Sequence, residues 1–111
     1  MKQQKFAKEF MTEIVQHKGI TIANTLIATD SEGRFRLNDL HQAAGGERRH
    51  GPSLWLENEK TKALAEEMTD TEIPVSVIKG GLKQGTYVCR ELVYAYAMWI
   101  SPKFHLKVIR T

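Results

Sequence analysis

Residues 80–107, GGLKQGTYVCRELVYAYAMWISPKFHLK, contain the features that decide the fold. A basic, glycine-rich loop here separates two strand-like runs, residues 74–79 and 86–89, and this arrangement predicts a β-hairpin. Residues 92–100 are apolar nearly all round and predict a buried helix. A Ser-Pro pair follows, a cap residue and a proline at the first helical position, and predicts a last helix. Core packing alone does not require a cationic hairpin tip, so we interpret it as a wing that touches an anionic partner.

The segment before this region is predicted to contain another hairpin and several short helices. Residues 20–29 are rich in β-branched side chains and indicate one strand, residues 30–33 have the sequence of a type I turn, and residues 34–37 indicate a returning strand. Asn38 is expected to cap a helix that Gly45 ends. The sequence therefore begins the domain with a hairpin that leads into a helix.

Two further helices are expected after a loop over residues 45–52. Ser53 is expected to cap the first, and the second is expected to run to Met68 with Leu64, Ala65 and Met68 facing inward. Short helices joined by tight turns are the ingredients of a helix-turn-helix. The predicted fold class is α+β, a small winged helix-turn-helix-like domain with an N-terminal β-hairpin, central short helices, a wing β-hairpin and C-terminal helices.

The chain of 111 residues fits one globular domain, with 41% hydrophobic and 26% charged residues. Phe6, Phe10 and Ile14 recur at helical spacing, so residues 1–19 are predicted to form an amphipathic helix or arm and residues 20–111 the domain. A homodimer through this helix stays open. A further C-terminal domain also stays open, because nothing ends the last helical pattern before Thr111.

The compartment expected for this sequence is a reducing cytoplasm. A lone cysteine, Cys89, has no partner for an intramolecular disulfide, and no signal segment opens the chain. No apolar run approaches the roughly 20 residues of a membrane helix. A membrane partner is therefore not expected.

The formal charge of +3 is unevenly distributed along the chain. Residues 79–111 contain six lysines and arginines against one acid, Glu91, whereas residues 57–72 form an acidic run that Lys60 and Lys62 interrupt. This polarity predicts one electropositive face, with chance clustering on a solvated surface as the alternative interpretation.

Four separated motifs resemble the KilA-N domain of phage, bacterial and large-DNA-virus proteins, which is related to the APSES domain of fungal transcription factors. They are FRLNDLHQAAG (residues 35–45), SLWL (53–56), VIKGGLKQGTYV (77–88) and AMWISPKFHLKV (97–108), and the resemblance covers about residues 21–111. It implies a domain that binds double-stranded DNA with a helix-turn-helix-like element and an adjacent wing. The residues that match the wing signature are Gly80, Gly81, Gln84, Gly85 and Thr86, and those that match structural positions are Trp55, Trp99, Ser101 and Pro102. Residues 47–52 depart from any pattern that we can align.

The candidate DNA contacts are Arg48, Arg49, Asn58, Lys60, Lys62, Lys79, Gly81, Lys83, Gln84 and Thr86. Lysine and arginine neutralise phosphates, an arginine fork matches guanine, and a glutamine amide can pair with adenine or with a phosphate. Glu66, Glu67 and Asp70 would be repelled by phosphate. Only residues 58–62 of the second central helix are therefore expected to approach DNA.

Catalysis, metal binding and cofactors are not expected. The four histidines and the cysteine match no usual ligand spacing, and neighbouring glutamates on a helix usually form a solvated face. A different class of function stays open: a protein-interaction module, such as an antirepressor or host-factor inhibitor, that keeps the fold without strong DNA binding.

Overall fold

The computed structural model describes residues 19–111, so the helix and the dimer contact predicted for the N-terminal residues lie outside its described part. The elements are β1 (Ile20–Ile22), β2 (Thr25–Ile27), β3 (Phe35–Arg36), α2 (Leu37–Ala43), a 3₁₀ helix η1 (Arg48–His50), α3 (Pro52–Leu56), α4 (Glu59–Met68), β4 (Val75–Ile78), β5 (Gly85–Val88), α5 (Arg90–Ile100) and α6 (Pro102–Ile109). This order confirms the predicted α+β class, including the wing hairpin and the two C-terminal helices.

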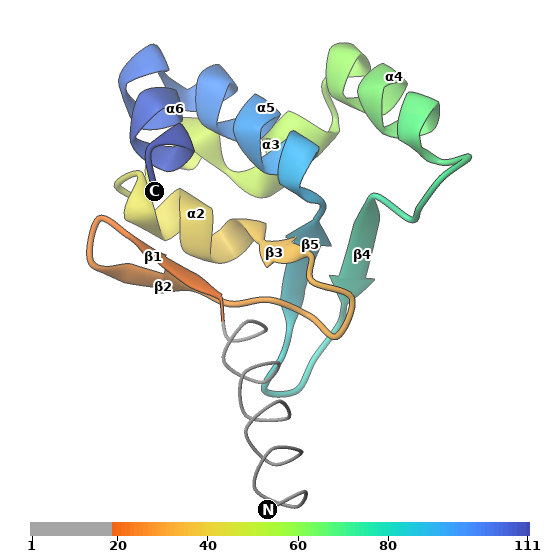
Figure 1. Cartoon of the computed structure of the whole chain (residues 1–111), viewed down its shortest axis with the longest axis horizontal. Helices are drawn as coiled ribbons and strands as arrows, with labels where there is room; N and C mark the ends of the chain where they lie inside the picture. Colours follow the sequence, from red (N-terminus) through yellow and green to blue (C-terminus); the bar gives the residue numbers. More distant parts are fainter. Residues whose placement is uncertain (1–18) are drawn as a thin grey trace, which may run out of the picture.

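The strands form two antiparallel sheets. One is the β1–β2 hairpin, and the other has the order β3-β5-β4, with β5 in the centre. Val88 of β5 lies opposite Phe35 of β3 on one side and Val75 of β4 on the other. Figure 1 shows α2, α3, α5 and α6 gathered at one end of β4 and β5, with the wing loop at the other end and α4 apart from the other helices. Strand β5 therefore connects the helical core to the wing.

The first hairpin differs from the sequence prediction, which made residues 20–29 one strand. Ala23 and Asn24 have positive φ angles of 50° and 65°, so the chain reverses between β1 and β2 in a tight turn. Asparagine tolerates this conformation, but alanine gives no turn signal, and the β-branched neighbours concealed the reversal. The predicted turn after it is confirmed, because the Gly33 amide donates to the Asp30 carbonyl at 3.1 Å.

The helix starts also differ in part from the predictions. Helix α2 begins at Leu37, with Arg36 at the cap position, so Asn38 does not cap it. Helix α3 begins at Pro52 and not after Ser53, and η1 interrupts the predicted loop. Gly45, with φ 111°, follows the end of α2 as expected.

Helix α4 ends at Met68 as predicted, but one of the apolar residues predicted to face inward is exposed. Asn58 caps the helix, its Oδ1 accepting from the Lys60 amide at 2.9 Å. Leu64 was expected to face inward and is 38% exposed, whereas Thr61 is buried. The helix packs on the rest of the domain through a narrow face.

Helix α5 is the centre of the core, as its uniformly apolar sequence predicted. Its buried residues are Leu92, Val93, Tyr96 and Ala97, and they pack with Ile22, Ile27, Leu37, Leu40, Trp55, Val88, Phe104 and Val108. Ser101 then caps α6 by accepting from the Phe104 amide at 3.0 Å. The two C-terminal helices thus pack against each other, and α6 adds Phe104 and Val108 to the core.

Tyr96 joins α5 to the segment before α3. Its side chain is fully buried, its ring centroid lies 5.1 Å from that of Trp55, and its hydroxyl donates to the His50 carbonyl at 2.5 Å. Burial raises the pKa of this phenol, which keeps it protonated as a donor. Tyr96 and Trp55 are therefore core residues.

We expect Tyr96→Phe to lower the free energy of unfolding by about 1–3 kcal/mol, because the partly buried His50 carbonyl loses its donor. Urea denaturation measures this change. Tyr94→Phe on the same helix is the matched control, because its hydroxyl makes no hydrogen bond within residues 19–111. Equal effects of the two substitutions would contradict a role for the Tyr96 hydroxyl.

Candidate nucleic-acid interface

The wing loop, residues 79–84, is exposed along its whole length. Gly80 and Gly81 have φ angles of 81° and 83°, a left-handed conformation that favours glycine, and an added Cβ at either position would meet open space. Leu82 at the tip is fully exposed. The loop therefore projects an unusual combination of glycine backbone, a leucine and polar side chains into solvent.

The cations of the wing are free to meet a partner. Lys79 and Lys83 are exposed and form an ion pair with none of residues 19–111. Residues 79–86 contain no acid. This part of the hairpin is thus purely cationic.

The backbone on both sides of Gly85 is held firmly, in contrast to the tip. The Gln84 carbonyl accepts from Arg36, the Thr86 amide donates to Asn38, and the Lys83 carbonyl accepts from the Tyr87 hydroxyl at 2.7 Å. The predicted contact residues Gln84 and Thr86 therefore have anchored main chains, and the Gln84 side chain is exposed.

The start of α4 offers less positive charge than the wing. Lys60 is unpaired within the described part of the chain, but the Nζ of Lys62 lies 3.8 Å from the Oε1 of Glu59. The Asn58 side chain already accepts the cap hydrogen bond. Over the whole helix, two lysines face three glutamates, all five exposed. The helix is slightly acidic.

Arg48 and Arg49 lie in η1 on the surface. Arg49 Nε is 2.6 Å from a carboxylate oxygen of Glu47, so its charge is matched locally. Arg48 has no ion-pair partner in the described region. Arg48 is thus the one of the two that can meet an anion without first breaking an ion pair within the described region.

These three groups do not form a single patch. Figure 1 shows the wing loop and α4 at opposite ends of β4, and the segment between α2 and α3 that contains η1 lies away from the wing loop. The structure brings together Lys79, Gly81, Lys83, Gln84 and Thr86 on the wing. It places Asn58, Lys60 and Lys62 at the start of α4, and Arg48 and Arg49 in a third position.

A shallow groove separates α4 from α5. It has a volume of about 230 Å³ and is lined mainly by apolar side chains, among them Trp55, Leu64, Met98 and Trp99. Met98 is 49% exposed. The predicted contacts Asn58 and Lys60 lie at this groove.

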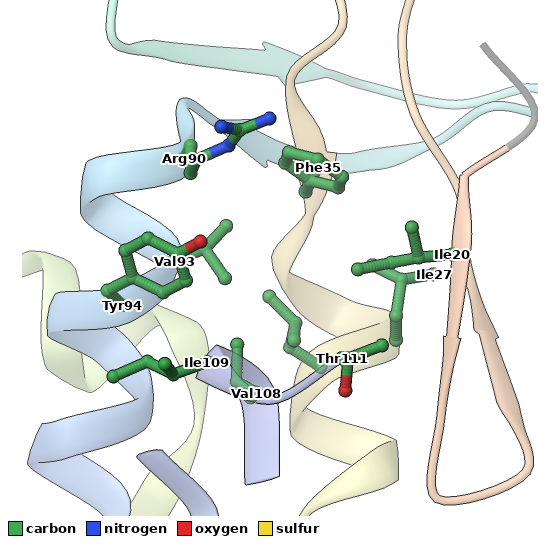
Figure 2. Close-up of a pocket in the computed structure, with 10 residues that line it drawn as sticks. Ile20, Ile27, Phe35, Arg90, Val93, Tyr94, Val108, Ile109 and Thr111 are labelled. Atoms are coloured by element: carbon green, nitrogen blue, oxygen red, sulfur yellow. The ribbon is translucent and has the colours of Figure 1, made fainter. Parts of the chain in front are cut away.

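A second cavity, of about 180 Å³, lies between the first hairpin and the C-terminal helices. Figure 2 shows Ile20 and Ile27 on one side and Val93 and Tyr94 on the other, with Arg90 beside Phe35 at one end. Among residues 19–111, no Asp, Glu, His or Cys side chain lines it, so the described lining contains no acid–base pair or usual metal ligands.

One group of potential metal ligands does come together in the described residues. Ligand atoms of Glu72, Cys89 and Glu91 lie within 4.8 Å of one another. Burial raises the pKa of the Cys89 thiol, and both carboxylates act in the same direction, which opposes the thiolate that a metal would need. A single thiol beside two exposed carboxylates gives no basis for a metal assignment.

Sequence reasoning missed the anchoring residues and Leu82. Arg34 and Arg36, in the predicted returning strand, are both engaged within the fold. Arg34 Nε is 2.7 Å from Asp30, and Arg36 NH1 is 2.7 Å from Asp39. The i,i+4 and i,i+3 spacings of these pairs were the available signals.

No helix in residues 19–111 is long and apolar enough to span a membrane.

Comparison with known proteins agrees with the motifs. The KilA-N domain profile matches residues 18–111. The chain is 37% identical over 91 residues to Protein kilA of Escherichia phage P1, an alignment that covers 81% of this chain and 34% of that protein. No solved structure matches the chain. The chain therefore belongs to the KilA-N domain family, a family of phage-type regulatory domains.

Proposed function

We propose that this domain binds double-stranded DNA and that the wing makes its primary contact. The observation that supports this most directly is that Lys79 and Lys83, on an acid-free hairpin tip, form no ion pair within residues 19–111. Phosphate attraction supplies most of the sequence-independent affinity of DNA-binding proteins. Among the three groups of predicted contact residues, the wing is the one in which no neighbouring carboxylate in the described part of the chain competes with phosphate.

The other wing residues suit contact with a groove. Gly80 and Gly81 add no side-chain bulk, so the backbone can approach a groove wall. The exposed Gln84 amide can pair with adenine or with a phosphate, and the fully exposed Leu82 can contact a thymine methyl group. Lysines supply affinity in this proposal, and Gln84 and Leu82 supply sequence preference.

Helix α4 contributes at its amino-terminal end only. Lys60 and the backbone amides of the first turn favour an anion there, whereas Glu66 and Glu67 at the other end repel phosphate. Arg48 can serve as a further phosphate contact. Because the groups are separated, a duplex that meets both the wing and the start of α4 must extend along the β4 side of the domain (Figure 1).

We place this activity in a phage- or prophage-type regulator that acts in the bacterial cytoplasm. The function proposed is binding and not catalysis, and it needs no cofactor. The chain covers 34% of the length of the phage P1 relative, so DNA binding is proposed for this domain and not for a whole protein of that kind.

A protein-interaction module is the second candidate function, and the α4–α5 groove favours it. Leu54, Leu64 and Met98 are exposed apolar residues on neighbouring helices. Such side chains suit a protein surface better than a phosphate backbone. An antirepressor or host-factor inhibitor would use this surface and would bind DNA weakly and with little dependence on salt.

We expect the logarithm of the DNA association constant to fall linearly with the logarithm of the salt concentration. The slope should be roughly −4 to −5, because about four to six phosphates are neutralised. Lys79→Ala/Lys83→Ala should reduce the slope by roughly two units, because two phosphate contacts are lost. Fluorescence anisotropy with a random duplex at several salt concentrations measures this slope.

Lys103→Ala/Lys107→Ala on α6 is the matched control, since it removes the same charge from exposed positions away from the wing. It should leave the slope within about half a unit of the parent. A wing variant with the parent slope would remove the wing from the contact surface. A flat salt dependence in the parent would favour the protein-interaction module.

For α4 we expect Lys60→Ala to reduce the slope by roughly one unit, because Lys60 lies at the end that approaches phosphate. Glu66→Lys should change affinity by less than about twofold, because Glu66 lies roughly 9 Å farther along the helix axis than Lys60, about one Debye length, so its charge is largely screened from phosphates at the other end. The same salt titrations decide which end of α4 faces the duplex. A neutral Lys60→Ala together with a strong effect of Glu66→Lys would show that α4 docks differently or not at all.

A further inference from the structure

Strand β3 is short, and α2 begins where a longer β3 would have continued to pair with the edge of β5. Strand β3 pairs with β5 through Phe35 and Arg36 and then ends, because the chain turns into α2 at Leu37. Within residues 19–111, the part of β5 on the wing side of Tyr87 therefore has no strand partner at that edge. Side chains of the β3–α2 junction take the place of the missing strand.

Arg36 supplies the donor that the absent strand would have provided. Its Nε and NH2 atoms both donate to the Gln84 carbonyl, at 2.9 and 2.7 Å. Its NH1 atom donates to Oδ1 of Asp39 at 2.7 Å, and the other oxygen of Asp39 accepts from the Ala28 amide at 3.0 Å. The guanidinium is therefore fixed at three of its nitrogens, and its charge is matched by a neighbouring carboxylate.

Asn38 supplies the acceptor. Its Oδ1 accepts from the Thr86 amide at 2.9 Å, a contact between residues 48 positions apart. Arg36 and Asn38 thus hold the main chain on the two sides of Gly85. We call this pair, together with Asp39, the wing latch.

Gly85 makes this approach possible. Its φ is 153°, and a Cβ built there would lie 2.6 Å from Arg36 Nε and 2.9 Å from Asn38 Oδ1. Any side chain would therefore displace the latch as well as strain the backbone. The requirement for glycine at this position comes from the two latch side chains and is distinct from the freedom of Gly80 and Gly81 at the tip.

We propose that Arg36 and Asn38 are positioning residues that set the direction of the wing relative to the core, and so prepare the tip for its DNA partner. This proposal rests on the proposed function for its second half only. The tip contains two glycines with open space around them, so its direction depends on how firmly its root is held. Pre-organisation of a contact loop raises affinity by lowering the entropy lost on binding. Because Arg36 is already paired with Asp39, it acts without adding a phosphate contact of its own.

The first arm of the test needs no ligand. In Asn38→Ala, hydrogen exchange of the Thr86 amide should become at least about tenfold faster, because its hydrogen-bond acceptor is lost. Amides of α5 should keep the parent rates. Asn38→Asp retains an acceptor oxygen and should restore slow exchange. Parent exchange at Thr86 in Asn38→Ala would overturn the latch.

Arg36→Lys is a second variant for the case in which Asn38→Ala fails to fold. It keeps the positive charge beside Asp39 but cannot donate two hydrogen bonds to one carbonyl from a planar fork. NMR relaxation of the amides in residues 80–86 should show increased mobility in this variant. Unchanged order parameters across the loop would contradict a positioning role for Arg36.

The second arm measures DNA binding. Arg36→Lys should weaken affinity for a duplex by about three- to tenfold and leave the salt slope within about half a unit of the parent, because no phosphate contact is lost. A slope reduced by a full unit would make Arg36 a direct contact and overturn the positioning role. If Arg36→Lys makes the wing mobile but leaves the affinity for the duplex unchanged, the direction of the wing does not matter for DNA binding. If the parent itself fails to bind duplex DNA, the proposed function fails, and the exchange arm still decides the latch.

Discussion

The contact between the β3–α2 junction and β5 is the interaction on which the arrangement of core and wing depends. Strand β5 has Tyr87 and Val88 buried in the domain at one end and the exposed wing loop at the other. Its root is held by side chains of Arg36 and Asn38, which come from a segment whose neighbours Leu37 and Leu40 are fully buried in the core. The direction of the wing is therefore set by residues that the hydrophobic core fixes in place.

The positively charged side chains of this region are of two kinds: arginines in ion pairs within the fold, and lysines without an ion pair in the described residues, which can bind a partner. Arg34 and Arg36 are matched by Asp30 and Asp39 at 2.7 Å and serve the fold. Lys79 and Lys83 have no such partners within the described residues and lie at the exposed tip. Net charge of the chain does not reveal this difference, since all four contribute equally to the sum. Pairing decides which positive charges a polyanion can recruit without first breaking an internal contact.

Local signals in the sequence were sufficient for most of the elements and insufficient for the contacts between them. The Ser101 cap, the end of α2 at Gly45 and the glycine-rich wing depend on residues close in the chain, so short-range chemistry predicted them. Asn38 shows the limit of that approach. An asparagine before a helical stripe is a usual cap, but here its acceptor serves Thr86, far away in sequence, and the pattern of apolar residues contains no trace of that contact. The turn at Ala23 and Asn24 was missed because alanine gives no turn signal, whereas the contact of β2 with α2, which follows the turn, joins segments apart in the sequence.

The same contrast between local sequence signals and contacts distant in sequence applies to the candidate interface. Sequence reasoning found the wing residues because core packing seldom requires glycine, lysine and glutamine together at a hairpin tip, and the structure places these residues together. It grouped them with α4 because helix-turn-helix proteins commonly read DNA with a helix. The slightly acidic surface of α4 and its separation from the wing weaken that analogy for this chain (Figure 1). Of the two elements, the wing offers the more unpaired positive charge, so in the proposed docking α4 contacts DNA only where its amino-terminal end can reach the phosphates.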